Sequence, residues 1–367
     1  MRRRPAALLA LGVGFVLAAS GAAFAAAPSL STRAQSVAAP AADDSASPSS
    51  ETATLIGPAP EAVVAVVAPA VEPKAAPASM AFDEMKHVWQ SLNNCGPASV
   101  VMALSTLGVD VSQEFARVPL RGTNVLSGMG PQKVDGWVNA NFGLRSVWRN
   151  NGTNDLMRRL VANGFAPMVT QWLRDPTISR IAHWRTVRGY DDDLGVFYVN
   201  DPMLGANVPL SYDWFNANWQ PFSYRWMVLY QPADAARVQR IVGPDWTEIG
   251  MRDRFYARAK ADAHAQETSS AWLAYGEAAY QDGWFAEAVA AFERGMQLGS
   301  ATGVFTVRSS YPLALRALGR QNDANSAVAT LANLTTTPSP VVQSPDSYAL
   351  FIAFTRAHQN DSFALTE

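Results

Sequence analysis

Cys95 is the one cysteine of the 367-residue chain, and its surroundings are those of a nucleophile. It begins an apolar segment with helical spacing, residues 95–107, directly after Asn93 and Asn94, whose side chains can cap a helix. A thiolate at a helix N-terminus faces free N–H groups and the positive end of the dipole, which lower the pKa of the thiol. Gln90 lies five residues earlier, so its amide and the Cys95 N–H can stabilise the oxyanion of an acyl-transfer intermediate. The alternative is a buried, unreactive cysteine.

A cysteine nucleophile needs a base, and the surrounding 150 residues contain two histidines, His87 and His183. His183 stands at the head of a strand-like segment, and one strand later Asp201 can place a carboxylate beside its imidazole and fix the tautomer. The chain order Gln, Cys, His, Asp is that of papain-like enzymes. His87 is the competing base, on the same local segment as Gln90. We therefore expect His183 to be the base and Asp201 to orient it.

These segments together resemble a known family, the bacteriocin-leader (double-glycine) cysteine peptidases and their broader peptidase-like relatives. The resemblance covers about residues 82–230 and is carried by Gln90-x4-Cys95-Gly96-Pro97-Ala98, His183-Trp184-x-x-Val187-x-Gly189-Tyr190-Asp191 and Asn200-Asp201-Pro202. It implies a papain-like fold with Gln90 as the oxyanion residue, Cys95 as nucleophile, His183 as base and Asp201 as its partner. Transporter-linked members of that family precede a membrane domain and an ATPase, whereas this chain differs on both sides. Cleavage of double-glycine leaders is therefore not carried over.

The composition is that of a globular protein with an unstructured tail. With 49% apolar and 16% charged residues, the chain is long enough for two domains with cores of their own. A net charge of −2 provides no basic surface for a nucleic acid, so we expect a peptide or protein substrate. One cysteine and no close His/Asp/Glu pairing argue against a zinc site, and we predict no cofactor and no metal.

The N-terminus has the features of a secretory signal. Residues 2–4 are arginines, residues 6–19 are apolar, and Ala23-Phe24-Ala25 is a cleavage site for signal peptidase. We predict a signal peptide over 1–25 and a secreted, periplasmic or cell-envelope protein that is not inserted in the membrane after cleavage. An uncleaved membrane anchor is the alternative. Residues 26–80 are rich in Ala and Pro and contain no aromatic residue, which predicts a disordered linker.

Residues 81–232 are predicted to form the peptidase domain, of class α+β and papain-like. The patterns indicate helices over 95–107 and 154–163 and strands over 167–172, 184–190 and 196–200. The last two strands join at an acidic turn. This order places the cysteine on a helix and the histidine and aspartate on two neighbouring strands.

Residues 244–362 are predicted to form an all-α, tetratricopeptide-like region that follows the peptidase domain. Gly276 and Ala288 are the small residues of a helix pair, and Gly319 repeats the position of Gly283 after 36 residues. A closing helix is expected over 347–358. A true array would bind a protein partner, whereas the alternative is a helical hairpin without a groove. In either case we expect the region to be separable from the peptidase domain.

Three functions fit the sequence. The first is an exported cysteine peptidase with a Cys-His-Asp triad and a Gln oxyanion hole. A cell-wall amidase or transpeptidase would use the same thiol chemistry, because the acyl-enzyme is common to hydrolysis and transfer. The third is a peptide-binding module without catalysis, and the intact set of four residues argues against it.

Overall fold

The computed structural model describes residues 71–124, 127–173, 181–299 and 307–335. All of them belong to one compact unit. The predicted signal peptide, residues 26–70 of the linker and the closing helix at 347–358 lie outside the described residues. Within the described part, no helix combines the length and the apolarity that a membrane span requires.

An antiparallel sheet, with strands of different lengths, forms the centre of the N-terminal half. Its strands run in the order β2-β7-β3-β4-β5-β6, and β1 pairs with β4 off this path. Their bounds are Ser79–Ala81 (β1), Arg145–Arg149 (β2), Met168–Trp172 (β3), Ala182–Asp191 (β4), Val196–Asp201 (β5), Gly205–Ser211 (β6) and Trp226–Tyr230 (β7). β4 and β5 pair with Thr186 opposite Asn200. This register sets Arg185 on β4 next to Asp201 at the end of β5.

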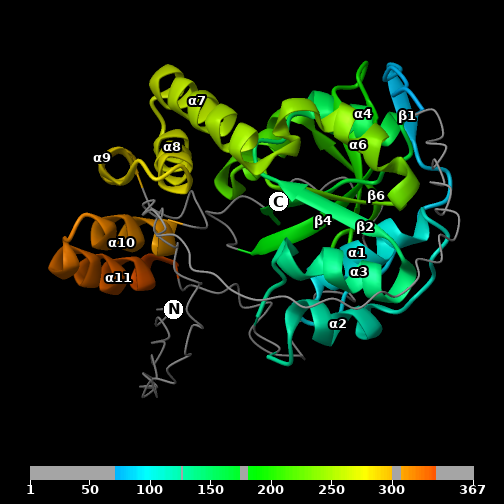
Figure 1. Ribbon diagram of the computed structural model, residues 1–367, viewed down its shortest axis with the longest axis horizontal. Helices are drawn as coiled ribbons and strands as arrows, with labels where there is room; N and C mark the ends of the chain where they lie inside the picture. The colour runs from blue at the N-terminus through cyan, green and yellow to red at the C-terminus, as the bar shows by residue number, and fades with distance from the viewer. Residues whose placement is uncertain (1–70, 125–126, 174–180, 300–306, 336–367) are drawn as a thin grey trace, which may run out of the picture. The chain divides into compact units, whose positions relative to one another are not determined.

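Helices cover the sheet on both faces, with α1, α2 and α3 grouped below it and α4 and α6 above it in Figure 1. Their bounds are Cys95–Ser105 (α1), Gln113–Arg121 (α2), Val134–Phe142 (α3), Asn154–Ala162 (α4), Tyr212–Trp219 (α5) and Ala235–Val242 (α6). All residues of α1 except Ser105 are buried, as expected for a helix that is apolar all round. α1 packs on β4, where the Thr186 hydroxyl donates to the Ser99 carbonyl at 3.0 Å.

The predicted α+β class is confirmed, and the predicted helices and strands correspond to α1, α4, β3, β4 and β5. The predicted cap of α1 is wrong. Asn94 occupies the N-cap position, but its side chain makes no capping bond and donates instead to Gln113 Oε1 of α2 at 2.7 Å. Asn93 adopts a left-handed conformation with φ of 53°. A contact with a neighbouring helix has replaced the local cap.

The predicted linker is structured at its end. The first two residues of β1, Ser79 and Met80, were expected to be disordered, and β1 pairs with β4. Before it, the Lys74 N–H donates to Asn163 Oδ1 at 2.7 Å, and the Tyr190 hydroxyl donates to the Pro77 carbonyl at 2.8 Å. Backbone groups before the predicted boundary at 81 therefore pair with the folded domain.

The C-terminal part is helical, as predicted. It contains α7 (Glu248–Gln266), α8 (Ser269–Gln281), α9 (Phe285–Leu298), α10 (Val307–Ala317) and α11 (Gln321–Thr335). Gly283 and Gly319 take positive φ values, 82° and 76°, in the turns after α8 and α10. Gly276 permits close approach of α8 and α9, since a Cβ there would lie 2.6 Å from the Phe292 ring. The tetratricopeptide-like character stays a prediction.

The C-terminal helices share contacts and an apolar core with the sheet domain. Arg149 Nε donates to the Trp246 carbonyl at 3.0 Å, and Arg258 Nη1 donates to the Gly152 carbonyl at 2.9 Å. One cluster of buried apolar side chains includes residues of β3, β7, α8 and α9. The helical region therefore packs against the sheet domain, and its separability stays a question for a truncated protein.

Candidate active site

Cys95 is the first residue of α1 and is 8% exposed. Burial raises the pKa of the thiol, but a hydrogen bond and positive charge from His183 and the N–H groups of Trp184 and Gly96 outweigh it, so the pKa lies below its ordinary value. Gly96 lets the chain pass closely over this site, because a Cβ there would lie 2.5 Å from the Met129 Cβ. The thiol thus sits at a helix terminus under a closely packed segment.

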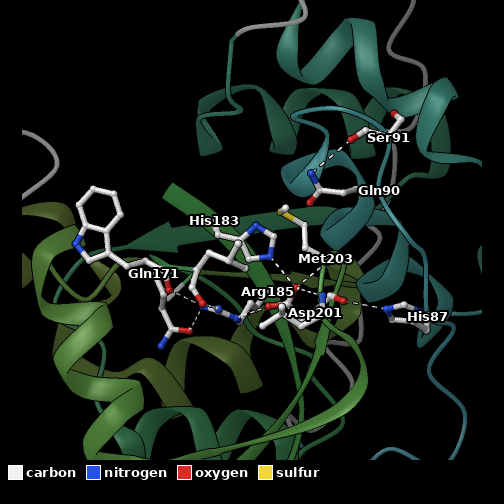
Figure 2. A network of polar contacts seen from close by, with 11 residues as sticks. His87, Gln90, Ser91, Gln171, His183, Arg185, Asp201 and Met203 are labelled. Atoms are coloured by element: carbon white, nitrogen blue, oxygen red, sulfur yellow. Dashed lines mark hydrogen bonds and ion pairs between the residues drawn. The ribbon is translucent and has the colours of Figure 1, made fainter. Parts of the chain in front are cut away.

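His183 and Asp201 meet at the ends of β4 and β5, and both side chains are fully buried. His183 Nε2 donates to Asp201 Oδ1 at 2.9 Å, as Figure 2 shows. The same oxygen accepts the N–H groups of Met203 and Leu204 at 2.7 and 2.9 Å. These bonds hold the carboxylate of Asp201 in place. The carboxylate in turn orients the imidazole ring of His183, and Nδ1 is the ring nitrogen that does not contact it.

The second ring nitrogen is the one available to the thiol. Nδ1 of His183 is buried and has no hydrogen-bond partner of ordinary geometry among the described residues. The Cys95 thiol nevertheless lies close enough to the ring to help raise the pKa of His183. The structure therefore brings Cys95, His183 and Asp201 together in the predicted order.

The pKa shifts of the pair favour a charged imidazole beside an ionised carboxylate. Burial lowers the pKa of His183, but the charge and hydrogen bond of Asp201, together with Cys95, outweigh it and raise the pKa above its ordinary value. Burial raises the pKa of Asp201, but the charges of His183 and Arg185 hold it well below its usual range. A lowered thiol pKa beside a raised imidazole pKa is the condition for a thiolate–imidazolium pair.

Arg185 is a residue of this site that the sequence analysis did not single out. It lies two residues after His183 on β4 and is fully buried. Its guanidinium donates to Asp201 Oδ2 at 2.6 Å, Gln171 Oε1 at 2.9 Å, the Trp172 carbonyl at 3.0 Å and the Leu173 carbonyl at 2.6 Å. Its spacing from His183 is the signal that could have revealed it, because residues two apart in a strand lie on the same face and buried arginines need partners.

Gln90 and His87 lie in the segment before α1. Gln90 is buried, its N–H donates to the Pro202 carbonyl at 3.0 Å, and its Nε2 donates to the Ser91 carbonyl at 3.4 Å. Gln90 is thereby held next to the residue that follows Asp201. His87 Nε2 donates to the backbone carbonyl of Asp201 at 2.9 Å, on the side away from His183 in Figure 2. His87 thus contacts the backbone of Asp201 and not its carboxylate.

A cavity of about 250 Å³ opens beside the thiol. The side chains that line it include Cys95, Met129, Thr170, Trp184, Phe222 and Arg225. Trp184 is positioned by its indole N–H, which donates to the Met129 carbonyl at 3.0 Å. The volume is below the roughly 300–1,000 Å³ of pockets for drug-sized ligands, so it suits one side chain of a peptide.

Elsewhere in the described residues, no three His, Cys, Asp or Glu side chains gather as a metal ion would require. His264 is exposed on α7, with its ring edge-on to Trp272 at 5.0 Å. His358 lies outside the described residues.

Comparison with known proteins agrees with this geometry. Residues 82–227 match the model of the Peptidase_C39 like family. This part of the chain is therefore similar to relatives of cysteine peptidases. A solved structure of a candidate C39-like peptidase from Bacillus anthracis has a TM-score of 0.34 and 11% sequence identity, over 42% of this chain and 98% of that chain. No curated protein matches the chain.

Proposed function

We propose that the protein is an exported cysteine peptidase with Cys95 as nucleophile, His183 as base, Asp201 as the residue that orients the base and Gln90 as an oxyanion donor. The observation that carries the proposal is the continuous contact from Asp201 through His183 to Cys95, at the N-terminus of a buried helix. The match of residues 82–227 to a family of peptidase relatives supports it.

In the resting state the proton of the thiol resides on His183. The lowered pKa of Cys95 and the raised pKa of His183 favour this transfer, and Asp201 stabilises the resulting imidazolium through Nε2. Because the Asp201 carboxylate is fixed by two backbone N–H groups and Arg185, the ring does not need to reorganise during the reaction.

Acylation begins with attack of the thiolate on the carbonyl carbon of a peptide bond. The carbonyl oxygen takes the negative charge, and the Cys95 N–H and the Gln90 amide stabilise it. The tetrahedral intermediate collapses as the C–N bond breaks, and His183 gives its proton to the leaving amine. The products are a thioester that joins the N-terminal fragment of the substrate to Cys95 and a released C-terminal fragment with a new free amino group.

Deacylation uses the now neutral His183 to remove a proton from water as the water attacks the thioester carbonyl. The C–S bond breaks, the acid product leaves, and the proton retained by His183 restores the thiolate–imidazolium pair. One water is consumed for each peptide bond. If an amine replaces water at this step the reaction is transpeptidation, which is the reason that the amidase or transpeptidase alternative shares the same residues.

The proposed location and partners rest on the sequence. Residues 1–25 have the features of a signal peptide, and the near-neutral charge favours a peptide or protein substrate. The C-terminal helices would dock a protein partner or the natural substrate. Detection of a mature N-terminus at Ala26 in an exported form tests the location.

The test of catalysis is the reactivity of Cys95. We expect iodoacetamide to alkylate it at pH 6–7 at least about tenfold faster than free cysteine, because its thiolate is already formed at that pH. The His183→Ala variant should fall to the rate of an ordinary thiol and lose peptide hydrolysis. The matched control is His264→Ala, which removes an exposed histidine far along the chain. Equal rates for free cysteine, wild type and His183→Ala would exclude the thiolate–imidazolium pair.

A further inference from the structure

One wall of the cavity beside Cys95 is a short irregular segment, residues 127–130. It lies between α2 and α3 in the chain, and its residues Gly128, Met129 and Gly130 line the cavity of about 250 Å³ together with the thiol. Met129 is buried, whereas Gly128 and Gly130 on either side of it are exposed. The methionine thus anchors the segment, and the two glycines form its solvent-facing side.

Packing against the start of α1 fixes this segment at Met129. Trp184 Nε1 donates to the Met129 carbonyl at 3.0 Å, and a Cβ on Gly96, next to the nucleophile, would lie 2.5 Å from the Met129 Cβ. Cys95, Met129 and Trp184 belong to one cluster of buried apolar side chains. Close packing of this kind allows little movement, so the segment has a defined position relative to the thiol.

Arg121, the last residue of α2, holds the segment at Ser127. It is 7% exposed, and its Nη1 donates to the Asn124 and Ser127 carbonyls at 3.4 and 3.3 Å. Burial lowers the pKa of Arg121, as does the charge of Arg117, whereas the charge of Cys95 raises it, so the guanidinium lies within electrostatic range of the thiol. α2 lies beside α1 in Figure 1. Arg121 therefore connects α2 to the wall of the cavity.

Gly128 is the position of this wall where an added side chain would project into open space. A Cβ there would meet no atom of the described residues within 4 Å, and the φ of Gly128 lies outside the left-handed region. Neither the backbone nor the packing of the described residues therefore requires glycine at this position. Gly130 differs, since a Cβ there would lie 2.3 Å from Gln132 Oε1. Glycine is also the residue that lets a ligand approach the backbone closely, and Gly128 shares its cavity with the nucleophile.

We propose that residues 127–130 form one wall of the substrate-binding groove and that Gly128 controls access to it: the backbone of an extended peptide lies against Gly128, and one side chain of the peptide enters the cavity beside Cys95. Arg121 and Trp184 are positioning residues, which act on the substrate through this segment. The inference rests on the proposed function, because it concerns the substrate of the reaction at Cys95. It deepens that function by naming the residue that sets the width of the groove.

The first experiment places a side chain at Gly128. Gly128→Leu should lower kcat/KM for fluorogenic peptides by at least about tenfold, mainly through KM, because the leucine occupies the space of the peptide backbone. Iodoacetamide labelling of Cys95 and the midpoint of urea unfolding should not fall, because the small reagent does not need the groove. Gly136→Leu adds the same side chain at an exposed glycine of α3 and should leave kcat/KM and labelling at wild-type values. An unchanged kcat/KM in Gly128→Leu, or an equal fall in labelling, overturns the proposal.

The second experiment removes the bond from Arg121 to the segment. Arg121→Met should raise KM for the same peptides by at least about threefold and leave kcat within about twofold of wild type, because a displaced wall weakens binding and leaves the triad in place. Arg121→Lys keeps a positively charged donor and should recover part of the change in KM. Arg117→Met is the control, since Arg117 lies on the same helix and pairs with Glu114. A fall in kcat with an unchanged KM would contradict the role of Arg121 in the wall.

A third measurement separates failure of this inference from failure of the proposed function. The rate at which an N-iodoacetyl tripeptide labels Cys95 is divided by the rate for iodoacetamide, and this ratio needs no catalysis. Gly128→Leu should lower the ratio by about tenfold, whereas Gly136→Leu should not change it. Slow labelling of the wild type by both reagents refutes only the thiolate–imidazolium pair, and equal ratios in wild type and Gly128→Leu refute only the groove. If Gly128→Leu does not fold, the ratio in Gly128→Ala decides: a lower ratio supports the groove, and an equal one refutes it.

Discussion

Replacing Arg185 by methionine should strongly destabilise the protein. The substitution keeps an unbranched side chain but removes the positive charge that lies 2.6 Å from Asp201 Oδ2 in a fully buried site. It also leaves the carbonyls of Trp172 and Leu173 without the donor that they have in the wild type. Removing one partner of a buried ion pair costs about 3–5 kcal/mol, so we expect a loss of that size in the free energy of unfolding at pH 7.

The destabilisation should depend on pH in a defined direction. The pKa of Asp201 is lowered in the folded state, so its ionised form stabilises the fold above the unfolded pKa of about 4, and this contribution is lost as the pH falls through the folded pKa. Loss of Arg185 raises the folded pKa. The difference between wild type and Arg185→Met should therefore be constant from pH 6 to 8 and shrink as the pH falls below about 4.

Urea unfolding followed by tryptophan fluorescence measures this difference at each pH. Arg185→Lys keeps the charge but lacks the planar guanidinium with its several N–H donors. Its free energy of unfolding should therefore lie between those of wild type and Arg185→Met. Arg188→Met is the control on the same strand, since the Arg188 side chain donates to the Asp83 carbonyl at 3.2 Å at an exposed position, and it should change stability by less than about 0.5 kcal/mol. A loss of less than about 1 kcal/mol in the free energy of unfolding of Arg185→Met would show that the ion pair with Asp201 does not stabilise the folded protein.

Three further predictions follow from the site and the packing. Gln90→Ala should lower turnover about a hundredfold and leave iodoacetamide labelling of Cys95 intact, because it removes an oxyanion donor and not the base; loss of labelling would assign Gln90 a structural role. Gly276→Ala should destabilise the protein by about 1–3 kcal/mol in urea unfolding, because its Cβ would meet the Phe292 ring, whereas Gly136→Ala, in open space on α3, should be neutral or stabilising. Deletion of residues 244–367 should abolish the cooperative unfolding transition, because these residues share a core with the sheet domain, and a truncated protein that unfolds cooperatively and hydrolyses small peptides would contradict this.

The elements that carry the candidate site were predictable because their signals are local. The apolar run after Cys95 predicts a buried helix, and the strand patterns around His183 and Asp201 predict neighbouring strands. The spacing along the chain therefore allowed the proximity of the thiol, the imidazole and the carboxylate to be predicted. The roles of Gln90, Cys95, His183 and Asp201 in catalysis remain predictions that the experiments above test.

Contacts between distant segments were not predictable, because no local pattern records which partner a polar side chain finds. Asn94 is a residue type that commonly caps helices, yet its side-chain amide donates to Gln113 on α2. Residues 79–81 have the composition of a linker, yet the free edge of β4 pairs with them. The helical region looks independent in sequence, yet its buried faces need the sheet domain to cover them.

The sequence by itself determined the α+β class, the helical C-terminal part and the residues that can do thiol chemistry, since each depends on residue type and periodicity. Only the tertiary structure decided which partners the charged side chains near these residues find. Arg185 lies within β4 and Arg225 directly precedes β7, and the sequence does not show which acceptors either guanidinium finds. The register of β4 and β5 gives Arg185 the Asp201 carboxylate, whereas Arg225 donates to Asn150 Oδ1 at 3.4 Å and lies over the Trp148 ring. Electrostatic partners depend on position in space, and chain order does not specify that position.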